Sequence, residues 1–316
     1  MSNEFSGVLC LYKEQGMTSH DAVNKIRRLY NTKQVGHTGT LDPMATGVLP
    51  ILVGRAVKAG EYLSSDDKSY VALLKLGLTT DTEDIWGKTL TVSEALPKKE
   101  EVFAIKERFL GEILQTPPMY SALKVGGKKL CDLARTGVEI ERQARPVFIK
   151  SLEIEEVSES EGLYKVYASV SKGTYIRTLC ADMGRALSCG GAMAGLERTA
   201  SGPFKKEDTV TLAQLEEMTS EERGSRLLPL ESLFSDLPAL RLPEFYGRLC
   251  SSGCPIYFKK LGISLPIGRR VRLYRREVFF ALGQTGVYEE GEGVKAIKQF
   301  VLFNDKEDSQ KGGTPC

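Results

Sequence analysis

The stretch VGHTGTLDPMATGVLP, residues 35–50, decides how the rest of the chain is interpreted. Its three glycines and two prolines disfavour helix and strand, so we expect a shaped loop whose backbone can approach a partner closely. One carboxylate, Asp42, stands in the middle, and Pro43 biases it toward an extended conformation. The apolar run 48–53 is typical of a buried strand. A carboxylate on such a loop suits a catalytic group, although a turn or capping role is the commoner use of an Asp-Pro pair.

Four segments of the chain carry a resemblance to a known family. The segments are GHTGTLDPMATGVLP (36–50), TTDTEDIWG (79–87), QTPPMYSALK (115–124) and KGTYIRT (172–178). In this order they resemble the motifs of the TruB family of pseudouridine synthases, which make pseudouridine in the T loop (position 55) of transfer RNA. The resemblance spans residues 7–212, and four motifs in order are far more specific than any one of them.

The resemblance implies an architecture in two parts. We expect an α+β fold over residues 1–232, with a mixed, largely antiparallel β-sheet flanked by helices and an RNA-binding insertion at about 116–146. Short strand-like runs between Gly and Pro residues follow, and their position suits a small C-terminal β-barrel that resembles the PUA domain, over residues 236–304. The polar tail 305–316 is expected to be disordered. Three prolines between residues 228 and 243 predict a linker.

The catalytic set implied by the resemblance is Asp42, Tyr70 and Arg177. A carboxylate is a suitable nucleophile because it can form a labile adduct and later leave. Burial raises a carboxylate's pKa, and the fixed charge of Arg177 would oppose that shift. The uridine must be flipped out of its stack to be reached, and Tyr70 would stack on the flipped base. Taken alone, Tyr70 would more often be a core tyrosine and Arg177 a surface ion pair.

Further side chains are expected to bind the substrate. The resemblance implies that Tyr175 and Leu196 line the pocket and that His37 fills the place the base left. Lys58 would bridge Asp84 or a phosphate. The acidic loop that contains Asp84 lacks the ligand count and glycine of a calcium hand, so by itself it predicts a solvated turn.

Two basic segments suit a polyanionic partner. The segment 124–150, which includes Lys124 of the PPMYSALK region, has seven basic and three acidic residues, a local net charge of +4. The segment 259–276 has seven basic residues and no acid, and its alternation predicts a row of arginines on one side of a strand. A solvated surface is the alternative in both cases. The whole chain carries only +2, which argues against a histone-like polycation.

Composition excludes several other classes. The 316 residues include two His and seven Cys without paired metal-type spacing, so no metal or other cofactor is expected. No apolar run approaches the length of a membrane span, and the start lacks a signal-peptide pattern, so a cytoplasmic protein is expected. The expected partner is the T stem-loop of transfer RNA, bound by a monomer without an obligate protein partner.

Three other functions stay open at this point. One is a guide-dependent synthase that resembles the dyskerin branch, which the long insertion disfavours. Another is a non-catalytic chaperone that folds transfer RNA, which an intact catalytic set disfavours. A nucleoside hydrolase would need a metal-binding aspartate cluster or a second carboxylate paired with Asp42, and the signature loop offers neither.

Overall fold

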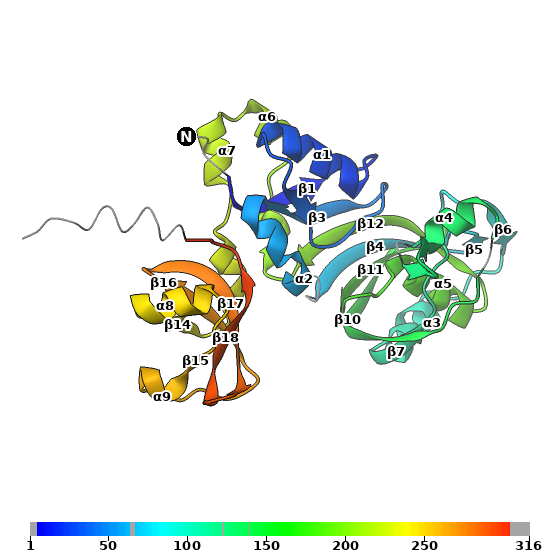
Figure 1. The fold of residues 1–316 in the computed structure, drawn as a ribbon. Coiled ribbons are helices and arrows are strands. Elements are labelled where there is room, and N and C mark those ends of the chain that lie inside the picture. The colour runs from blue at the N-terminus through cyan, green and yellow to red at the C-terminus, as the bar shows by residue number, and fades with distance from the viewer. Residues whose placement is uncertain (1–4, 64–66, 122, 139, 304–316) are drawn as a thin grey trace, which may run out of the picture.

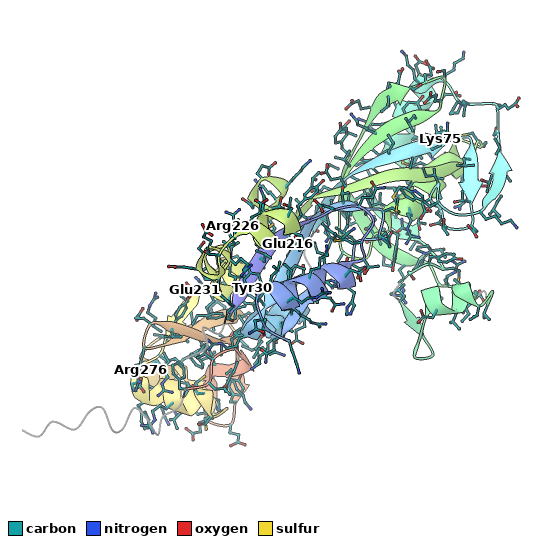
Figure 2. The ribbon with its side chains drawn as sticks, turned by 90° about the horizontal axis from the view of Figure 1, so that it is seen from above. Tyr30, Lys75, Glu216, Arg226, Glu231 and Arg276 are labelled. Carbon is teal, nitrogen blue, oxygen red and sulfur yellow. The ribbon has the colours of Figure 1, made fainter. Side chains whose placement is uncertain are left out.

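The protein is described by a computed structural model, which covers residues 5–63, 67–121, 123–138 and 140–303. The predicted disordered tail lies outside this range. Two units follow one another along an elongated molecule, in which Lys75 lies toward one end and Arg276 toward the other (Figures 1 and 2). No helix in the described ranges combines the length and the apolar composition needed to cross a membrane.

The first unit is built on a nine-stranded sheet (Figure 1). Its strand order is β1-β3-β12-β4-β11-β10-β7, with β2 beside β3 and β13 beside β12; only the β3–β12 pair is parallel. The strands are β1 Gly7–Lys13, β2 Val35–His37, β3 Thr46–Val53, β4 Lys68–Leu76, β7 Gly111–Gln115, β10 Arg145–Ser158, β11 Leu163–Val170, β12 Gly191–Ser201 and β13 Phe204–Lys205. This mixed, largely antiparallel sheet agrees with the prediction.

Helical elements pack on both faces of this sheet. The first of them starts at a capping box, in which the Thr18 hydroxyl and the Asp21 carboxylate each bind the other's backbone N–H. The helical elements of this unit are α1 Ser19–Leu29, η1 Gly54–Ala59, α2 Gly60–Leu63, α3 Lys99–Ala104, η2 Ile105–Arg108, α4 Leu130–Arg135, α5 Ile176–Ala186, η3 Lys206–Asp208, α6 Leu212–Glu217 and α7 Ser220–Ser225. Side chains of α1, α3, α5 and α6 share one core with the sheet. The helical segment from Lys99 to Arg108 changes from α-helix to 3-10 helix after Ala104.

Strand β3 is buried on both faces, as its apolar sequence predicted. Leu49 and Ile51 point into the core under the helices, whereas Val48 and Leu52 belong to a second core on the opposite face. The second core also contains Phe279 of the C-terminal unit. The two units therefore share buried apolar surface, which fixes one against the other.

The predicted linker at 228–243 is wrong. This segment contains η4 Leu230–Phe234, and Leu233 and Phe234 are buried in the core that joins the two units. Leu228 also exchanges two backbone hydrogen bonds with Val8 at the edge of the sheet. The prolines end regular structure here, but the apolar residues between them pack.

The C-terminal unit is a curled five-stranded sheet in the order β14-β16-β17-β18-β15. Its elements are β14 Ala239–Arg241, α8 Glu244–Ser251, β15 Ile256–Tyr257, α9 Phe258–Leu261, β16 Arg270–Arg275, β17 Val278–Tyr288 and β18 Gly291–Gln299. Two small sheets project from the first unit: β5 Leu78–Thr80 with β6 Thr89–Val92, and β8 Lys124–Val125 with β9 Lys128–Lys129. In the described residues β14 does not pair with β15, so the predicted barrel is not confirmed.

The prediction that β16 carries arginines on one side is confirmed for Arg270 and Arg272, which alternate with the buried Val271 and Leu273. It fails for Arg275, which is buried. Arg270 is exposed, but its guanidinium stacks over the Tyr62 ring of the first unit. Arg272 donates to the Leu237 carbonyl and to the Tyr274 hydroxyl. Arg275 is fully buried against a carboxylate of α8. Although the segment contains no acid, its arginines contact side chains and carbonyls of neighbouring elements and contribute to packing.

Candidate active site

The signature loop is the part of residues 35–50 that connects β2 and β3. It is held by hydrogen bonds to residues that precede it in the chain. The Ser19 hydroxyl, at the start of α1, both donates to the Leu41 carbonyl at 3.0 Å and accepts the Leu41 N–H at 2.8 Å. The Gly16 N–H donates to the Pro43 carbonyl at 2.9 Å. Asp42 lies between these two anchored residues, so its backbone position is fixed from both sides.

Two buried cations, both missed by sequence reasoning, support the same loop. Lys13 has no exposed surface, and its ammonium donates to the carbonyls of Glu14, Met17 and Pro43 at 2.8–3.2 Å. Burial lowers the pKa of Lys13 to about 8, although the negative charge of Asp42 acts in the opposite direction. For Lys13 and for Arg198, the only signal in the sequence was a charged residue inside a stretch with the pattern of a buried strand.

Arg198 holds the other side of the loop. It is 1% exposed, and its guanidinium donates to the carbonyls of Gly39, Thr40 and Val48 at 3.1, 3.5 and 2.7 Å. Gly47 has a φ of +107°, and a Cβ there would lie 2.2 Å from the Arg198 carbonyl oxygen. A glycine is therefore required where β3 and β12 come together.

Asp42 and Arg177 meet in an ion pair. The Arg177 Nε lies 2.9 Å from Asp42 Oδ2; the arginine side chain is 8% exposed and the carboxylate 42%. Arg177 stands on the first turn of α5, whose N-cap Tyr175 is anchored through its backbone to the side-chain amide of Gln115. A buried, permanently charged guanidinium thus faces a carboxylate that solvent or a ligand can still reach.

Arg177 also joins three segments that are distant in sequence. Its Nη1 donates to the Thr82 carbonyl at 3.2 Å and its Nη2 to the Tyr120 carbonyl at 2.8 Å. Asp84 Oδ2 lies 3.9 Å from Nη1, with its side chain 16% exposed. The signature loop, the loop after β5 and the start of the predicted insertion therefore converge on one guanidinium.

Tyr70, Tyr175 and Leu196 come from elements around this pair. Tyr70 is 8% exposed on β4, directly opposite Arg198 of β12. Leu196 is half-buried on β12 and packs against the core under the helices. Burial raises the pKa of the Tyr175 phenol. Tyr175 directly precedes the helix that carries Arg177, and Tyr70 and Leu196 share a core with Leu41, the residue before Asp42.

Three predicted residues are not joined to the Asp42–Arg177 pair by any contact in the described part of the chain. His37 is half-buried on β2, where burial and then the charge of Arg198 lower its pKa. Lys58 is exposed in η1, beyond the end of β3 that lies away from Asp42, and makes no ion pair with Asp84 among the described residues. Lys124 begins β8, and its side chain lies outside the described residues.

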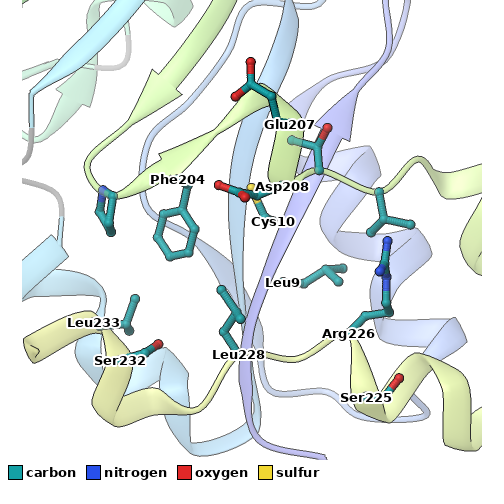
Figure 3. A pocket seen from close by; sticks show the side chains of 13 residues that line it. Leu9, Cys10, Phe204, Glu207, Asp208, Ser225, Arg226, Leu228, Ser232 and Leu233 are labelled. Atoms are coloured by element: carbon teal, nitrogen blue, oxygen red, sulfur yellow. The ribbon is translucent and has the colours of Figure 1, made fainter.

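One cavity lies away from this pair, and neither Asp42 nor Arg177 lines it. It has a volume of about 500 Å³ and lies beside β1, between Phe204 and Leu228 (Figure 3). Cys10 faces it, and burial raises the pKa of that thiol to about 12, so the thiol is no nucleophile. The described residues contain no cluster of three or more His, Cys, Asp or Glu side chains that could hold a metal ion.

Comparison with protein families shows to which family the chain with this Asp42–Arg177 pair belongs. The family model described as the N-terminal domain of TruB family pseudouridylate synthase matches residues 27–176, and the one described as the C-terminal domain of tRNA pseudouridylate synthase B matches residues 177–235. The chain belongs to the TruB family. It is a pseudouridine synthase, an isomerase, and the matched span contains Asp42, Tyr70 and Arg177.

Curated members of the TruB family are similar along nearly the whole chain. A tRNA pseudouridine synthase B of Alkaliphilus oremlandii is 42% identical over 304 residues, covering 96% of this chain and 100% of the relative. One of Listeria innocua is 46% identical over 244 residues, covering 76% and 80%. The similarity therefore includes both units of the molecule.

Solved structures show the same fold. One, described as a Cbf5-Nop10-Gar1 complex, aligns with a TM-score of 0.71 at 27% identity and covers 95% of this chain and 86% of that one. Another, the archaeal box H/ACA sRNP Nop10-Cbf5 complex, aligns with a TM-score of 0.68 at 25% identity, covering 96% and 88%. These neighbours confirm the predicted pseudouridine synthase fold of the TruB-family chain.

Proposed function

We propose that this TruB-family enzyme converts a uridine in the T loop of transfer RNA to pseudouridine, with Asp42 as the nucleophile. One observation carries the proposal: Asp42 lies on a loop held by buried cations, and its half-exposed carboxylate faces the buried Arg177 at 2.9 Å. The names of the curated relatives support transfer RNA as the substrate. The matched family supports the reaction type.

The isomerisation needs no external energy and no leaving group. The bond between N1 of uracil and C1′ of the ribose breaks, the base turns, and a bond from C5 to C1′ replaces it. C5 loses one proton and N1 takes one up, so the product is an isomer of the substrate. Asp42 would attack the nucleotide as the ionised carboxylate. Arg177 would keep the carboxylate charged as the site closes and excludes water, because a guanidinium does not give up its proton.

The detached base must be held while it turns. Tyr70 would stack on the uracil face, and Tyr175 and Leu196 would close the apolar walls. Asp84 would orient Arg177, which it faces at 3.9 Å. His37 would occupy the space that the flipped base leaves in the RNA loop, and Lys58 and Lys124 would contact phosphates. Together these roles place the reacting base between the signature loop and β12.

The domain organisation extends the proposal. Residues 1–232 would carry catalysis, with the insertion 116–146 closing on the RNA. Residues 236–304 would act as a PUA-like RNA-binding unit. The enzyme would work as a monomer in the cytoplasm without an obligate protein partner. In the guide-dependent alternative, suggested by the neighbours solved with Nop10, transfer RNA alone would not be modified.

Tritium release tests the proposal. Transfer RNA transcripts labelled at C5 of uracil are incubated with wild type, Asp42→Asn and Asp236→Asn, and the modified position is mapped. We expect release from the T loop with wild type and with Asp236→Asn, whose carboxylate is exposed and remote from Arg177. Asp42→Asn should bind the RNA without releasing tritium, because an amide is a poor nucleophile. Turnover by Asp42→Asn would remove Asp42 from its role.

A further inference from the structure

The loop between β5 and β6 borders the candidate active site, and two of its three acidic side chains face α5. The Glu83 carboxylate accepts the Thr178 hydroxyl at 2.6 Å on α5. Asp84 faces Arg177, and Asp81 accepts the backbone N–H of Lys88 at 2.7 Å. Glu83 and Asp84 thus face α5, whereas Asp81 is exposed and hydrogen-bonded within the loop.

The same loop directs apolar and basic side chains outward. Ile85 is 41% exposed and Trp86 is 43% exposed, and Lys88 beside them is also exposed. Trp86 is the only tryptophan of the chain. An exposed indole is costly to leave in water, and surfaces that combine aromatic and basic side chains are typical of sites for single-stranded nucleic acid.

The backbone of Trp86 is rigidly connected to the catalytic pair. Its N–H donates to Asp84 Oδ1 at 3.1 Å, while the other oxygen of that carboxylate faces Arg177. The Ile85 N–H donates to the Met193 carbonyl on β12 at 3.0 Å. A Cβ on Gly87 would lie 2.1 Å from Thr82 Oγ1, so only glycine allows the loop to close this tightly. The backbone that carries the indole is therefore held beside the site.

We infer that Trp86 is a stacking platform for one unpaired base of the RNA loop next to the target uridine. The occupant is a nucleobase because Trp86 is bound through its N–H to Asp84, which faces Arg177 of the site where the uridine itself would be bound. Flipping one base out of an RNA loop unstacks its neighbours, and an exposed indole can replace the lost stacking. Trp86 would thus bind the substrate without taking part in bond breaking. This inference rests on the proposed RNA substrate.

The single tryptophan makes the contact directly observable. All tryptophan emission of the protein comes from residue 86. The emission of the Asp42→Asn protein is titrated with a T-arm hairpin, while RNA binding is measured independently by anisotropy of a labelled RNA. We expect quenching that saturates with the binding curve. Free N-acetyltryptophanamide in the same RNA corrects for absorbed light. Unchanged emission at saturating, verified binding would overturn the inference.

Kinetics separate a binding role from a chemical one. Trp86→Ala should raise the dissociation constant and KM about 5- to 150-fold, the usual range for losing one base–aromatic stack. Its single-turnover rate at saturating enzyme should stay near that of wild type, and Trp86→Phe should recover most of the affinity. The control is Tyr167→Ala, which removes an exposed aromatic side chain on the face of the sheet opposite to Tyr70. It should change neither the dissociation constant nor the single-turnover rate.

RNA variants identify the stacked base. Each loop nucleotide next to the target is replaced in turn by an abasic one and tested with wild type and Trp86→Ala. At the stacked position, the abasic change should weaken RNA binding by wild type as much as Trp86→Ala weakens binding of the intact RNA. The two changes together should lower the affinity no further than either change alone. If wild type forms pseudouridine but the losses in binding from Trp86→Ala and from the abasic change add up at every position, the stacking role of Trp86 is overturned. Absence of pseudouridine with wild type would instead refute the proposed function.

Discussion

Two arginine–carboxylate pairs, one in each unit of the molecule, have almost the same burial. Arg177 is 8% exposed and its partner Asp42 is 42% exposed, whereas Arg275 is fully buried and its partner Glu244 is 41% exposed. Each pair therefore places a desolvated guanidinium beneath a half-exposed carboxylate. Burial by itself does not distinguish a reactive pair from a structural one.

The number of donors around each carboxylate distinguishes them. Glu244 receives Nε and Nη2 of Arg275 at 3.1 and 2.5 Å, and Nε and Nη2 of Arg276 both at 2.9 Å. Hydrogen bonds from these arginines lower the pKa of Glu244 to about 2. Within the described part of the chain Asp42 forms one ion pair, since the other nitrogens of Arg177 donate to backbone carbonyls. Because Arg177 occupies only part of the hydrogen-bonding capacity of Asp42, this carboxylate keeps lone pairs for a substrate.

Arg177→Met should cause the largest loss of the variants considered for these pairs. It leaves Asp42 without its cation and frees the carbonyls of Thr82 and Tyr120, so both the charge and the convergence of three segments are lost. We expect turnover to fall roughly 10²- to 10³-fold or more, as when one electrostatic contact at a reacting group is deleted. Single-turnover tritium release measures it. Arg185→Ala, on the exposed side of the same helix, is the matched control, and equal losses would contradict the role of Arg177.

Lys13→Met should come next. It removes the donors to three carbonyls, including that of Pro43 directly after Asp42. A displacement of Asp42 by about 1 Å would lower turnover on the order of 10- to 100-fold. Lys25→Met, which removes an exposed lysine of α1, is the control and should retain activity. Full activity of Lys13→Met would show that Ser19 and Arg198 suffice to hold the loop.

The pKa of Lys13 gives the same variant a pH signature. The folded value is about 8 and the ordinary value is 10.5. Between these pH values the unfolded chain holds a proton that the folded chain has lost, so the stability contribution of Lys13 rises with pH. Turnover should fall over the same range, because the neutral amine has fewer donors for the loop. Lys13→Met should lack both changes when unfolding and turnover are followed from pH 7 to about 10.

The elements of the first unit were predictable because their signals are local. The Thr18 capping box, the apolar run of β3 and the alternation of β4 each follow from a few neighbouring residues. The segment 228–243 was misread because proline content indicates where regular structure ends, and not whether Leu233 and Phe234 find a core to enter. That core is supplied by residues some 180 positions earlier in the chain and by the C-terminal sheet.

The site was only partly predictable for a related reason. Motif resemblance indicated Asp42, Tyr70 and Arg177, but Lys13 and Arg198 act through backbone carbonyls, which any sequence supplies. No side-chain pattern marks such contacts. The arginines of β16 show the opposite error, because a run without acids was taken as a solvated or phosphate-binding face, whereas Arg275 is buried. Glu244 reaches Arg275 from 31 residues away, and only the packing of α8 on β16 brings them together.

Glu244→Gln tests the structural pair. It leaves the buried Arg275 with a neutral partner, and we expect a loss of roughly 2–3 kcal/mol in the free energy of unfolding, discounted for the half-exposed carboxylate. Turnover per folded molecule should not change. The contribution of Glu244 is fully present above pH 4.5 and is lost as the pH falls toward 2, so the variant should unfold with less dependence on acid in that window. Lost turnover at full folding would contradict the division between the two pairs.

Arg276→Ala should have the smallest effect and is the sharpest comparison. It leaves Glu244 with Arg275 alone, a carboxylate with one arginine, as Asp42 has. Because Arg276 is about half exposed, the loss in the free energy of unfolding should be only about 0.5–1 kcal/mol. The pKa of Glu244 should rise part of the way back toward 4.5, which an NMR titration of its carboxyl carbon can follow. An unchanged pKa would show that Arg275 alone saturates Glu244, and that the count of arginines is not what separates it from Asp42.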